Sequence, residues 1–243
     1  MGTSRAVKKR LIIVDGGVGA GKTTFIRNLA IQLGRYLKVV VVDEPVDRWV
    51  KLGILEKFYA DPLRYAYEFQ TCTFTTRTDR LLKALETPAD LYVLERSILT
   101  DRFVFMELQN RYCPAHETNM YNEWWPMWTE LLKEHDVEIE KMIYLKPSLS
   151  SCMARVRSRN RSGEVPKAGG GVSESYQMDL QKVHECFLEG KHSGDFPDMP
   201  ARPFPLIKVM VVGPELADGD FRPPKSEAIL TTANKIMAQL SVA

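Results

Sequence analysis

The chain has 243 residues, a formal net charge of +2 at pH 7, and 44% hydrophobic and 26% charged residues. This length and apolar fraction allow one α/β domain with a sizeable core. A net charge so close to zero does not indicate a protein that binds nucleic acid or a membrane surface through its overall charge. The sequence has no apolar run of about 18 residues, the length that spans a bilayer. Its four cysteines and four histidines show no metal-binding spacing.

The amino-terminal residues carry no convincing targeting signal. They are basic, but the apolar stretch after them breaks at Asp15, which makes it too short for a signal peptide. The run Lys8-Lys9-Arg10 is interpreted as a solvated entry into a strand in preference to a nuclear signal. We expect buried free thiols and an intracellular protein, with the cytoplasm favoured and the nucleus left open.

A glycine-rich stretch matches the phosphate-binding pattern G-x-x-x-x-G-K-[ST]. The apolar run 11–14 before it predicts a buried strand, and residues 24–33 after it have the apolar spacing of a helix. The glycines allow consecutive backbone N–H groups to face phosphate oxygens at a helix N-terminus, where anions are favoured. The expected phosphate-binding residues are Gly16, Gly17, Val18, Gly19, Ala20, Gly21, Lys22, Thr23 and Thr24.

Two residues of this P-loop have further expected roles. Lys22, expected to face solvent and ligand, would contact the β- and γ-phosphates, and Thr23 would bind Mg²⁺. A glycine-rich turn that binds nothing is the less favoured alternative. The motif alone does not identify the phosphate acceptor.

Acidic residues follow two further apolar runs. Residues 38–43 form a continuous β-branched run, which predicts a strand buried on both faces, and Glu44 comes directly after it. Residues 91–94 predict a third strand, with Glu95 and Arg96 at its carboxyl end. Ligands bind at the carboxyl edge of open α/β sheets, and P-loop enzymes keep a Mg²⁺-side acid there. Capping of the following helix is the alternative role for Glu44.

Two long helices are predicted, one between the second and third strands and one after the third strand. Residues 62–85 place Gln70, Thr73 and Arg77 on one face, which is either solvated or lines a pocket for a planar polar ligand. Residues 117–132 hold three of the four tryptophans in an amphipathic pattern that contains a proline. This second pattern favours a core or a dimer seam over a stacking platform for nucleic acid. We therefore predict a homodimer without a nucleic-acid partner.

The rest of the chain predicts strands at 141–145 and 206–212 and helices at 174–188 and 225–240. Four arginines fall within seven residues, at Arg155, Arg157, Arg159 and Arg161. A nucleic-acid patch is one interpretation of them. Beside a P-loop we favour a lid that closes arginines over a triphosphate, followed by a mobile loop at Ala168-Gly169-Gly170-Gly171.

Together these motifs resemble the deoxynucleoside kinase family, the group of deoxycytidine kinase, deoxyguanosine kinase and the insect multisubstrate enzyme. The resemblance rests on the P-loop, Glu44-Pro45-Val46 with Trp49, Phe69-Gln70-Thr71, Glu95-Arg96-Ser97 with Asp101-Arg102, Ile143-Tyr144-Leu145 and the arginines. It implies a P-loop kinase of the α/β class, with a central five-stranded parallel sheet and helices on both faces. It also implies one domain over residues 1–243 and an arginine-rich lid at about 155–175.

The resemblance also implies roles for individual residues. Glu44 would be the general base at the 5′-hydroxyl, Arg96 would stabilise the phosphoryl oxygens, and Glu95 would lie on the Mg²⁺ side. The implied contacts to substrate and lid are Gln70 to the base, Arg77 and Asp101 to the base edge, Tyr59 and Glu164 to the sugar 3′-hydroxyl, and Arg155, Arg159 and Arg161 to the phosphates. The chain departs from the family pattern in a Gly-rich segment after Glu164 and in Pro126.

The resemblance predicts ATP-dependent phosphorylation of the 5′-hydroxyl of a deoxynucleoside, with ATP as donor and Mg²⁺ as cofactor. Arg77 and Asp101 favour deoxycytidine or a purine deoxynucleoside over thymidine. A thymidine-preferring or broad-specificity kinase and a monophosphate kinase of the thymidylate kinase type are the alternatives. A switch GTPase is disfavoured because the sequence has no N-K-x-D stretch. Intact Lys22, Glu44 and Arg96 argue against a catalytically silent interaction protein.

Overall fold

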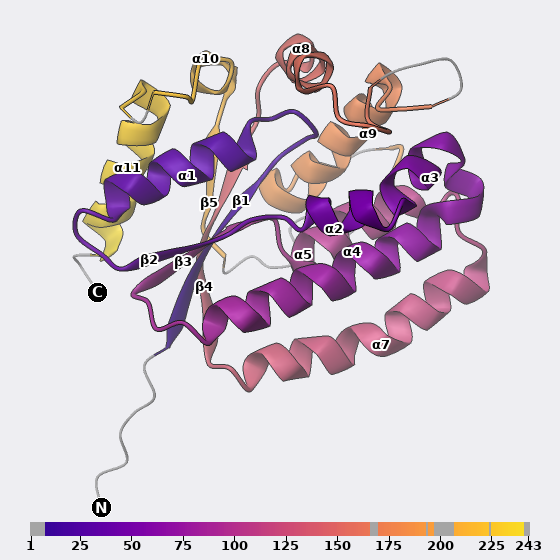
Figure 1. The fold of residues 1–243 in the computed structure, drawn as a ribbon, viewed down its shortest axis with the longest axis horizontal. Helices are drawn as coiled ribbons and strands as arrows, with labels where there is room; N and C mark the ends of the chain where they lie inside the picture. Colours follow the sequence, from indigo (N-terminus) through magenta and orange to yellow (C-terminus); the bar gives the residue numbers. More distant parts are fainter. Residues whose placement is uncertain (1–7, 166–169, 193, 197–206, 224, 241–243) are drawn as a thin grey trace, which may run out of the picture.

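The computed structural model describes residues 8–165, 170–192, 194–196, 207–223 and 225–240. Its strands form a parallel sheet in the order β2-β3-β1-β4-β5, with helices on both sides (Figure 1). The strands are β1 (Lys9–Asp15), β2 (Val39–Val42), β3 (Leu91–Glu95), β4 (Val137–Leu145) and β5 (Val209–Val212). The predicted α/β fold with a five-stranded parallel sheet is confirmed.

The longer helices lie close to their predicted positions, except α8, which the sequence analysis did not predict as a helix. They are α1 (Lys22–Leu33), α4 (Pro62–Leu85), α7 (Ala115–Lys133), α8 (Leu149–Arg159), α9 (Glu174–His184) and α11 (Glu227–Leu240). Shorter segments are α2 (Val46–Lys51), α3 (Ile54–Ala60), α5 (Ile98–Thr100), α6 (Glu107–Gln109) and α10 (Pro214–Ala217), with π-helical turns η1 (Asp101–Met106) and η2 (Glu185–Glu189). Local signals explain the start of α4, because Asp61 caps it and Pro62 occupies the first turn.

The core has two large apolar layers, one on each face of the sheet, and a smaller cluster made by Phe74, Ile98, Met106 and Tyr121. Because successive strand residues point to opposite faces, Ile12 and Val14 of β1 join the layer that includes residues of α1 and α11. Leu11 and Ile13 join the other layer, with residues of α4 and α9. Figure 1 shows α1 and α11 on one side of the sheet, with α4 and α7 on the other. The central strands therefore read as continuous apolar runs.

The strand predicted at residues 38–43 is present as β2, and its predicted burial on both faces is partly correct, because Val40 packs against one core layer and Val39 and Val41 against the other. The strand β2 lies at one edge of the sheet and pairs with β3 on one side. Val39, Val40 and Val41 are half-buried, and Val42 is buried. A continuous β-branched run indicates high strand propensity but not the strand's place in the sheet. Here the run forms an edge strand, whose outer side has no strand partner among the described residues.

Part of the predicted lid belongs to helix α8 and does not form a segment of its own. Arg155 and Arg159 belong to α8, which ends at Arg159, and α9 begins at Glu174. Residues 166–169 of the predicted lid, with Ala168 and Gly169 of the predicted mobile loop, lie outside the described residues. The arginine-rich lid therefore stays a prediction.

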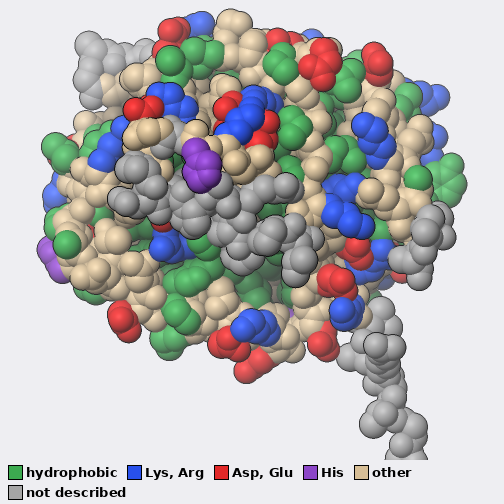
Figure 2. Space-filling model, turned by 180° about the vertical axis from the view of Figure 1, so that it is seen from behind, with side chains coloured by type: hydrophobic (Ala, Val, Ile, Leu, Met, Phe, Trp, Pro, Cys, Tyr) green, Lys and Arg blue, Asp and Glu red, His purple; other side chains and the backbone are tan. Residues whose placement is uncertain are grey.

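The surface seen in Figure 2 carries Lys and Arg side chains together with Asp and Glu side chains, spread over the face. In the described part of the chain, no helix is long and apolar enough to cross a membrane. All four cysteines are free thiols; Cys152 and Cys186 are buried, whereas Cys72 and Cys113 are half-buried. The expectation of buried thiols is therefore correct for two of them.

The packing of α1 makes a stability prediction. Leu29 is completely buried between the sheet and α11, so Leu29→Ala should lower the free energy of unfolding by about 2–5 kcal/mol. Ile31 of the same helix is 53% exposed, and Ile31→Ala should change it by less than about 0.5 kcal/mol. Urea unfolding followed by circular dichroism measures both. Equal losses in the two variants would contradict this description of the core.

Candidate active site

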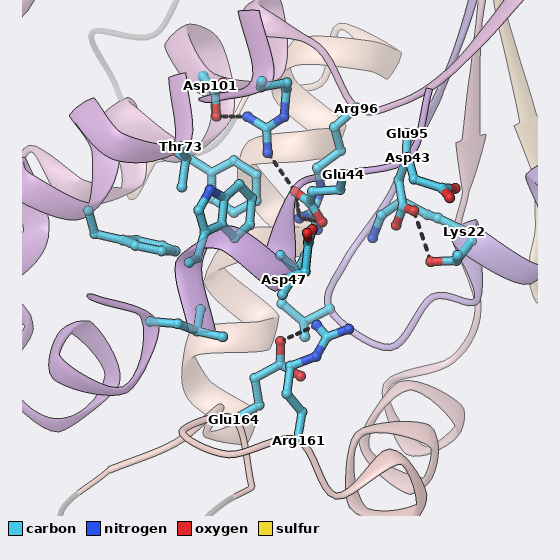
Figure 3. A pocket seen from close by; sticks show the side chains of 18 of the residues that line it. Lys22, Asp43, Glu44, Asp47, Thr73, Glu95, Arg96, Asp101, Arg161 and Glu164 are labelled. Carbon is cyan, nitrogen blue, oxygen red and sulfur yellow. Dashed lines mark hydrogen bonds and ion pairs between the residues drawn. The ribbon is translucent and has the colours of Figure 1, made fainter. Parts of the chain in front are cut away.

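A cavity of about 270 Å³ lies at the carboxyl ends of β1, β2 and β3. Figure 3 shows Glu44 near its middle, with Lys22 and Glu95 to one side and Asp101 and Glu164 at its ends. The predicted site residues that line it are Val18, Gly19, Lys22, Thr23, Glu44, Tyr59, Gln70, Arg77, Glu95, Arg96, Asp101, Arg159, Arg161 and Glu164. Parallel strands bring the segments that follow them to one edge, which explains why distant motifs meet here.

The backbone of the P-loop requires its glycines. Gly16, Gly19 and Gly21 have φ values of 145°, 78° and 89°, a region that residues with side chains rarely adopt. A side-chain carbon would also clash with the carbonyl oxygen of Leu145 at Gly16 and with that of Cys152 at Gly19. The pattern that identified the loop in the sequence is thus a requirement of its shape.

Lys22 is buried, contrary to the expectation that it faces solvent. Its Nζ donates to the backbone carbonyls of Gly16 and Gly17 at 3.1 and 2.9 Å, so the ammonium is held inside the loop. Burial, together with the nearby Arg96 guanidinium, lowers the pKa of Lys22 to about 8. The structure therefore holds the lysine's ammonium group against the inner side of the P-loop.

Glu44 is the centre of the charged groups in the cavity. Its carboxylate accepts hydrogen bonds from Arg96 Nη1 at 2.9 Å and from Arg77 Nη2 at 2.5 Å. Burial alone would raise the pKa of Glu44, but the two guanidinium groups and Lys22 outweigh it and hold the pKa at about 2. The carboxylate is thus ionised throughout the neutral pH range.

Arg96 connects Glu44 to the P-loop. Its φ is +62°, an uncommon conformation for a non-glycine residue, and its Nη2 donates to the carbonyl of Gly16 at 3.0 Å. Its guanidinium also lies 4.7 Å from the ring centre of Phe105. Burial opposes its charge, but Glu44 and Asp15 raise the pKa of Arg96 above its ordinary value. These contacts hold the uncommon backbone conformation of Arg96 and fix the direction of its side chain.

Thr23 and Glu95 offer oxygen ligands for a cation. The Thr23 hydroxyl donates to Glu95 Oε2 at 2.8 Å, at the edge of the P-loop. Burial and the nearby Glu44 carboxylate raise the pKa of Glu95. Mg²⁺ binds few protein ligands and completes its shell with water and substrate phosphates, so a hydroxyl and one carboxylate fit it. Among the described residues no group of three or more His, Cys, Asp or Glu side chains could hold a metal.

A second charged pair lies at the other end of the cavity. Arg77 forms an ion pair with Asp101, and both side chains are buried. Gln70, on the same face of α4, donates from Nε2 to the backbone carbonyl of Asp101 at 2.9 Å. Burial raises the pKa of Asp101 to about 6, although Arg77 opposes this shift. The helix face predicted to be either solvated or pocket-lining therefore lines the cavity.

Aromatic rings border this end of the cavity. Trp49 Nε1 donates to Thr76 Oγ1 at 2.8 Å, and the Arg77 guanidinium lies 5.5 Å from the Trp49 ring centre. Phe69 contacts the same tryptophan edge to face, with ring centres 5.7 Å apart. These contacts leave a flat apolar wall beside the polar groups of Arg77 and Asp101, an arrangement suited to a planar heterocycle.

Four further predicted residues, Tyr59, Arg159, Arg161 and Glu164, line another side of the cavity. Glu164 is buried and pairs with Arg161 at 2.7 Å and with Arg159. Tyr59 lines the cavity nearby, and burial raises the pKa of its hydroxyl. Two of the three predicted lid arginines thus reach the cavity together with the carboxylate predicted to hold the sugar.

Arg155, the third predicted lid arginine, is not among the residues that line this cavity. It belongs to α8, and its guanidinium donates to the carbonyls of Ala20, Ala217 and Gly219 at 3.1, 2.9 and 2.9 Å. It also lies 5.4 Å from the ring centre of Phe221. Arg155 therefore joins the P-loop to the segment after α10 instead of standing over the cavity with Arg159.

Sequence reasoning missed several residues of the cavity. Phe105 of η1 and Tyr176 of α9 line it, but neither belongs to a motif. Asp43 and Asp47 also line it, and their position beside Glu44 in the sequence was a signal that could have found them. The two aromatic residues have no such signal, because they come from helices whose packing on the sheet is a tertiary property.

The fold and this site are those of a P-loop phosphotransferase for a small polar acceptor. A sequence model of the family described as deoxynucleoside kinase matches residues 12–237, and the chain therefore belongs to the deoxynucleoside kinase family. It is a deoxynucleoside kinase, and nucleotide binding follows from membership of this P-loop family.

Individual relatives agree with this assignment. The chain is 34% identical over 187 residues to the probable deoxycytidine kinase of fowlpox virus (strain NVSL), covering 76% of this chain and 74% of the relative. It is 26% identical over 211 residues to deoxycytidine kinase of Homo sapiens, covering 76% and 78%. It is also 24% identical over 235 residues to the mitochondrial deoxyguanosine kinase of Xenopus laevis, covering 86% and 84%.

Proposed function

We propose that this protein transfers the γ-phosphate of ATP to the 5′-hydroxyl of a deoxynucleoside, and that it favours deoxycytidine or purine deoxynucleosides. The observation that carries the proposal is the position of the Glu44 carboxylate. On one side this carboxylate pairs with Arg96, which lies at the P-loop. On the other side it pairs with Arg77, which also pairs with Asp101 at the other end of the cavity. A hydroxyl bound at Glu44 would have a phosphate site on one side and a base site on the other.

In the proposed reaction, Glu44 orients the hydroxyl and accepts its proton. Its lowered pKa keeps the carboxylate ionised at neutral pH, so it can accept a hydrogen bond from the hydroxyl and orient it. This agrees with phosphoryl transfer, in which positioning and charge stabilisation contribute most of the catalysis. Arg96 and Lys22 would face the oxygens of the transferring group, where negative charge is redistributed.

Thr23 and Glu95 are the proposed protein side of a Mg²⁺ site. A cation held there would supply positive charge that offsets the charge of the phosphates. Thr23 would contribute its hydroxyl, and Glu95 would orient that hydroxyl and the water around the cation. The raised pKa of Glu95 supports this role, because a cation nearby would restore the carboxylate's preference for the ionised form.

The proposed preference for the base rests on Arg77 and Asp101. A guanidinium donor beside a carboxylate acceptor matches cytosine, which offers an amino donor beside the N3 acceptor, and adenine, which offers N6–H₂ beside N1 or N7. Thymine offers carbonyls to that carboxylate and adds a methyl group. A buried acceptor left without a donor costs roughly 1–3 kcal/mol. The names of the relatives, deoxycytidine and deoxyguanosine kinases, support this preference.

Two further properties stay predictions. A homodimer is supported by α7, on which Met120 and Met127 are 53% and 71% exposed beside the tryptophan-rich segment. A cytoplasmic location is supported by the four free thiols, which are typical of a reducing compartment.

The first functional prediction concerns the P-loop lysine. Lys22→Ala should abolish phosphoryl transfer while circular dichroism stays unchanged, because the Nζ contacts are to two carbonyls of one loop. Lys83→Ala, at an exposed position of α4, is the control and should keep the activity of the natural protein. A radiolabelled-ATP assay measures both, and near-normal turnover in Lys22→Ala would remove the P-loop from the mechanism.

The second prediction concerns the acceptor carboxylate. Glu44→Gln keeps the shape of the side chain but removes the charge, so turnover should fall by about 10²-fold or more. The affinity for the deoxynucleoside should change little, since Arg77 and Asp101 hold the base. Steady-state kinetics with Glu86→Gln, an exposed position, as the control separates the two effects. If turnover is kept and only affinity falls, Glu44 is a binding residue.

The third prediction concerns the base. Arg77 and Asp101 neutralise each other in the buried site, so they are replaced together, as Arg77→Met with Asp101→Ala. The double variant should gain activity with thymidine relative to deoxycytidine, measured as the ratio of the two kcat/KM values. Arg64→Met, on the exposed face of the same helix, should leave the ratio unchanged. The pair does not select the base if the natural protein already prefers thymidine or if the double variant gains none.

A further inference from the structure

Helix α9 contacts the P-loop through two buried side chains that no motif includes. Gln177 accepts from the backbone N–H of Val18 at 3.3 Å and donates from Nε2 to the Val18 carbonyl. The same amide leaves no room for a side chain at Gly17, where an added carbon would lie 2.9 Å from Nε2. One side chain thus pairs with both the N–H and the carbonyl of Val18. These groups need such a partner, because the P-loop has no strand or helix hydrogen bonds at this residue.

His184 contacts the start of the same loop, seven residues after Gln177 and therefore on the same face of the helix. Its Nε2 lies 3.0 Å from Oδ1 of Asp15, the last residue of β1. That oxygen also accepts from the backbone N–H of Gly16 at 2.8 Å, and Oδ2 accepts from the hydroxyl of Thr100 at 2.5 Å. The side chains of His184 and Asp15 are completely buried.

The hydrogen-bond partners of His184 show which ring nitrogens need a proton. Its Nδ1 lies 2.7 Å from the backbone carbonyl of Leu180, which can only accept, and its Nε2 faces a carboxylate. Both contacts are hydrogen bonds only when the imidazole carries a proton on each nitrogen. Burial alone would raise the pKa of Asp15, but His184 and Arg96 hold it below its usual range, so the carboxylate is ionised. A cationic ring would compensate the buried negative charge.

The surroundings of the imidazole keep it in this position. The Tyr144 ring stacks on it with an interplanar angle of 5° and a centroid distance of 5.6 Å, and Phe105 meets it edge to face at 6.4 Å. The guanidinium of Arg96 lies over the ring of Phe105, and Arg96 Nε lies 3.8 Å from Asp15. The histidine, the aspartate and the arginine therefore form one packed unit behind the first residue of the P-loop.

We propose that α9 positions the P-loop for the nucleotide through Gln177 and the doubly protonated imidazolium of His184, the counter-ion of Asp15. Both are positioning residues, because they act on the loop and not on the reacting atoms. The same helix carries Tyr176, which lines the acceptor cavity, and Val172 before it donates to the carbonyl of Glu164 at 2.9 Å. The helix α9 thus links the acceptor side of the site to the donor loop.

The proposal rests on the proposed function, in which the P-loop binds the phosphates of ATP, and Gln177→Met tests it. The variant keeps the length of the side chain but removes both bonds to Val18, so KM for ATP should rise about tenfold. The kcat and the KM for deoxycytidine should stay within about twofold of the natural protein. Gln181→Met makes the same change four residues further along α9, where Gln181 bonds Glu185, and should leave all three constants unchanged.

This comparison separates positioning from a general loss of structure. An unchanged KM for ATP in Gln177→Met, or an equal rise of KM for both substrates, would overturn the role of Gln177. If the natural protein transfers no phosphate at all, the proposed function fails. The part of the proposal that concerns His184 is then still tested, since its measurement needs no activity.

The charge of His184 is measured on the natural protein by nitrogen NMR of ¹⁵N-histidine. The chain has four histidines, and the single variants His116→Gln, His135→Gln and His192→Gln each remove one other signal, which assigns His184. We expect each His184 ring nitrogen to carry a proton in the folded protein, because each faces an acceptor, and to show long-range couplings to slowly exchanging protons. One bare nitrogen would show a neutral tautomer and overturn the proposed counter-ion.

Discussion

The site depends on one buried interaction, the Glu44 carboxylate held between the guanidinium groups of Arg96 and Arg77. All three side chains are almost completely buried, and their charges are tolerated because each has an opposite charge beside it, with Asp101 next to Arg77 and Asp15 near Arg96. Removing one partner would leave an uncompensated charge in a poorly solvated site. The three groups come from the ends of two strands and from α4, and their pairing therefore fixes how these elements meet at the sheet's edge.

The same network gives two neighbouring carboxylates opposite properties. The pKa of Glu44 falls to about 2 beside its two guanidinium partners, whereas burial and the charge of Glu44 raise the pKa of Glu95. Environments that push two pKa values apart divide roles between similar groups. Here the division agrees with an acceptor-side carboxylate that is always ionised and a donor-side carboxylate whose ionisation a bound cation would favour. Both carboxylates oppose the burial that lowers the pKa of Lys22 to about 8.

Much of the fold and of the site could be predicted, because the informative residues are constrained locally. The P-loop glycines are required by backbone conformation, and apolar runs predict the strands. Glu44 and Glu95 follow such runs, so the rule that ligands bind at carboxyl edges was enough to bring them together. What failed depended on neighbours distant in the chain. The edge position of β2 and the burial of Lys22 follow from pairing and packing, which a β-branched run and a motif do not encode.

Arg155 and His184 show why residue type is a weak guide without its partners. Arg155 stands four residues before Arg159 in one arginine-rich helix, yet three backbone carbonyls from the P-loop and the segment after α10 hold its guanidinium away from the cavity. His184 shows no metal-binding spacing in the sequence, and its partner Asp15 lies 169 residues away. A P-loop is usually described by its own residues. In this chain, Gln177 of helix α9 hydrogen-bonds both backbone groups of Val18, 159 residues before it, so a helix distant in the sequence contacts the motif directly.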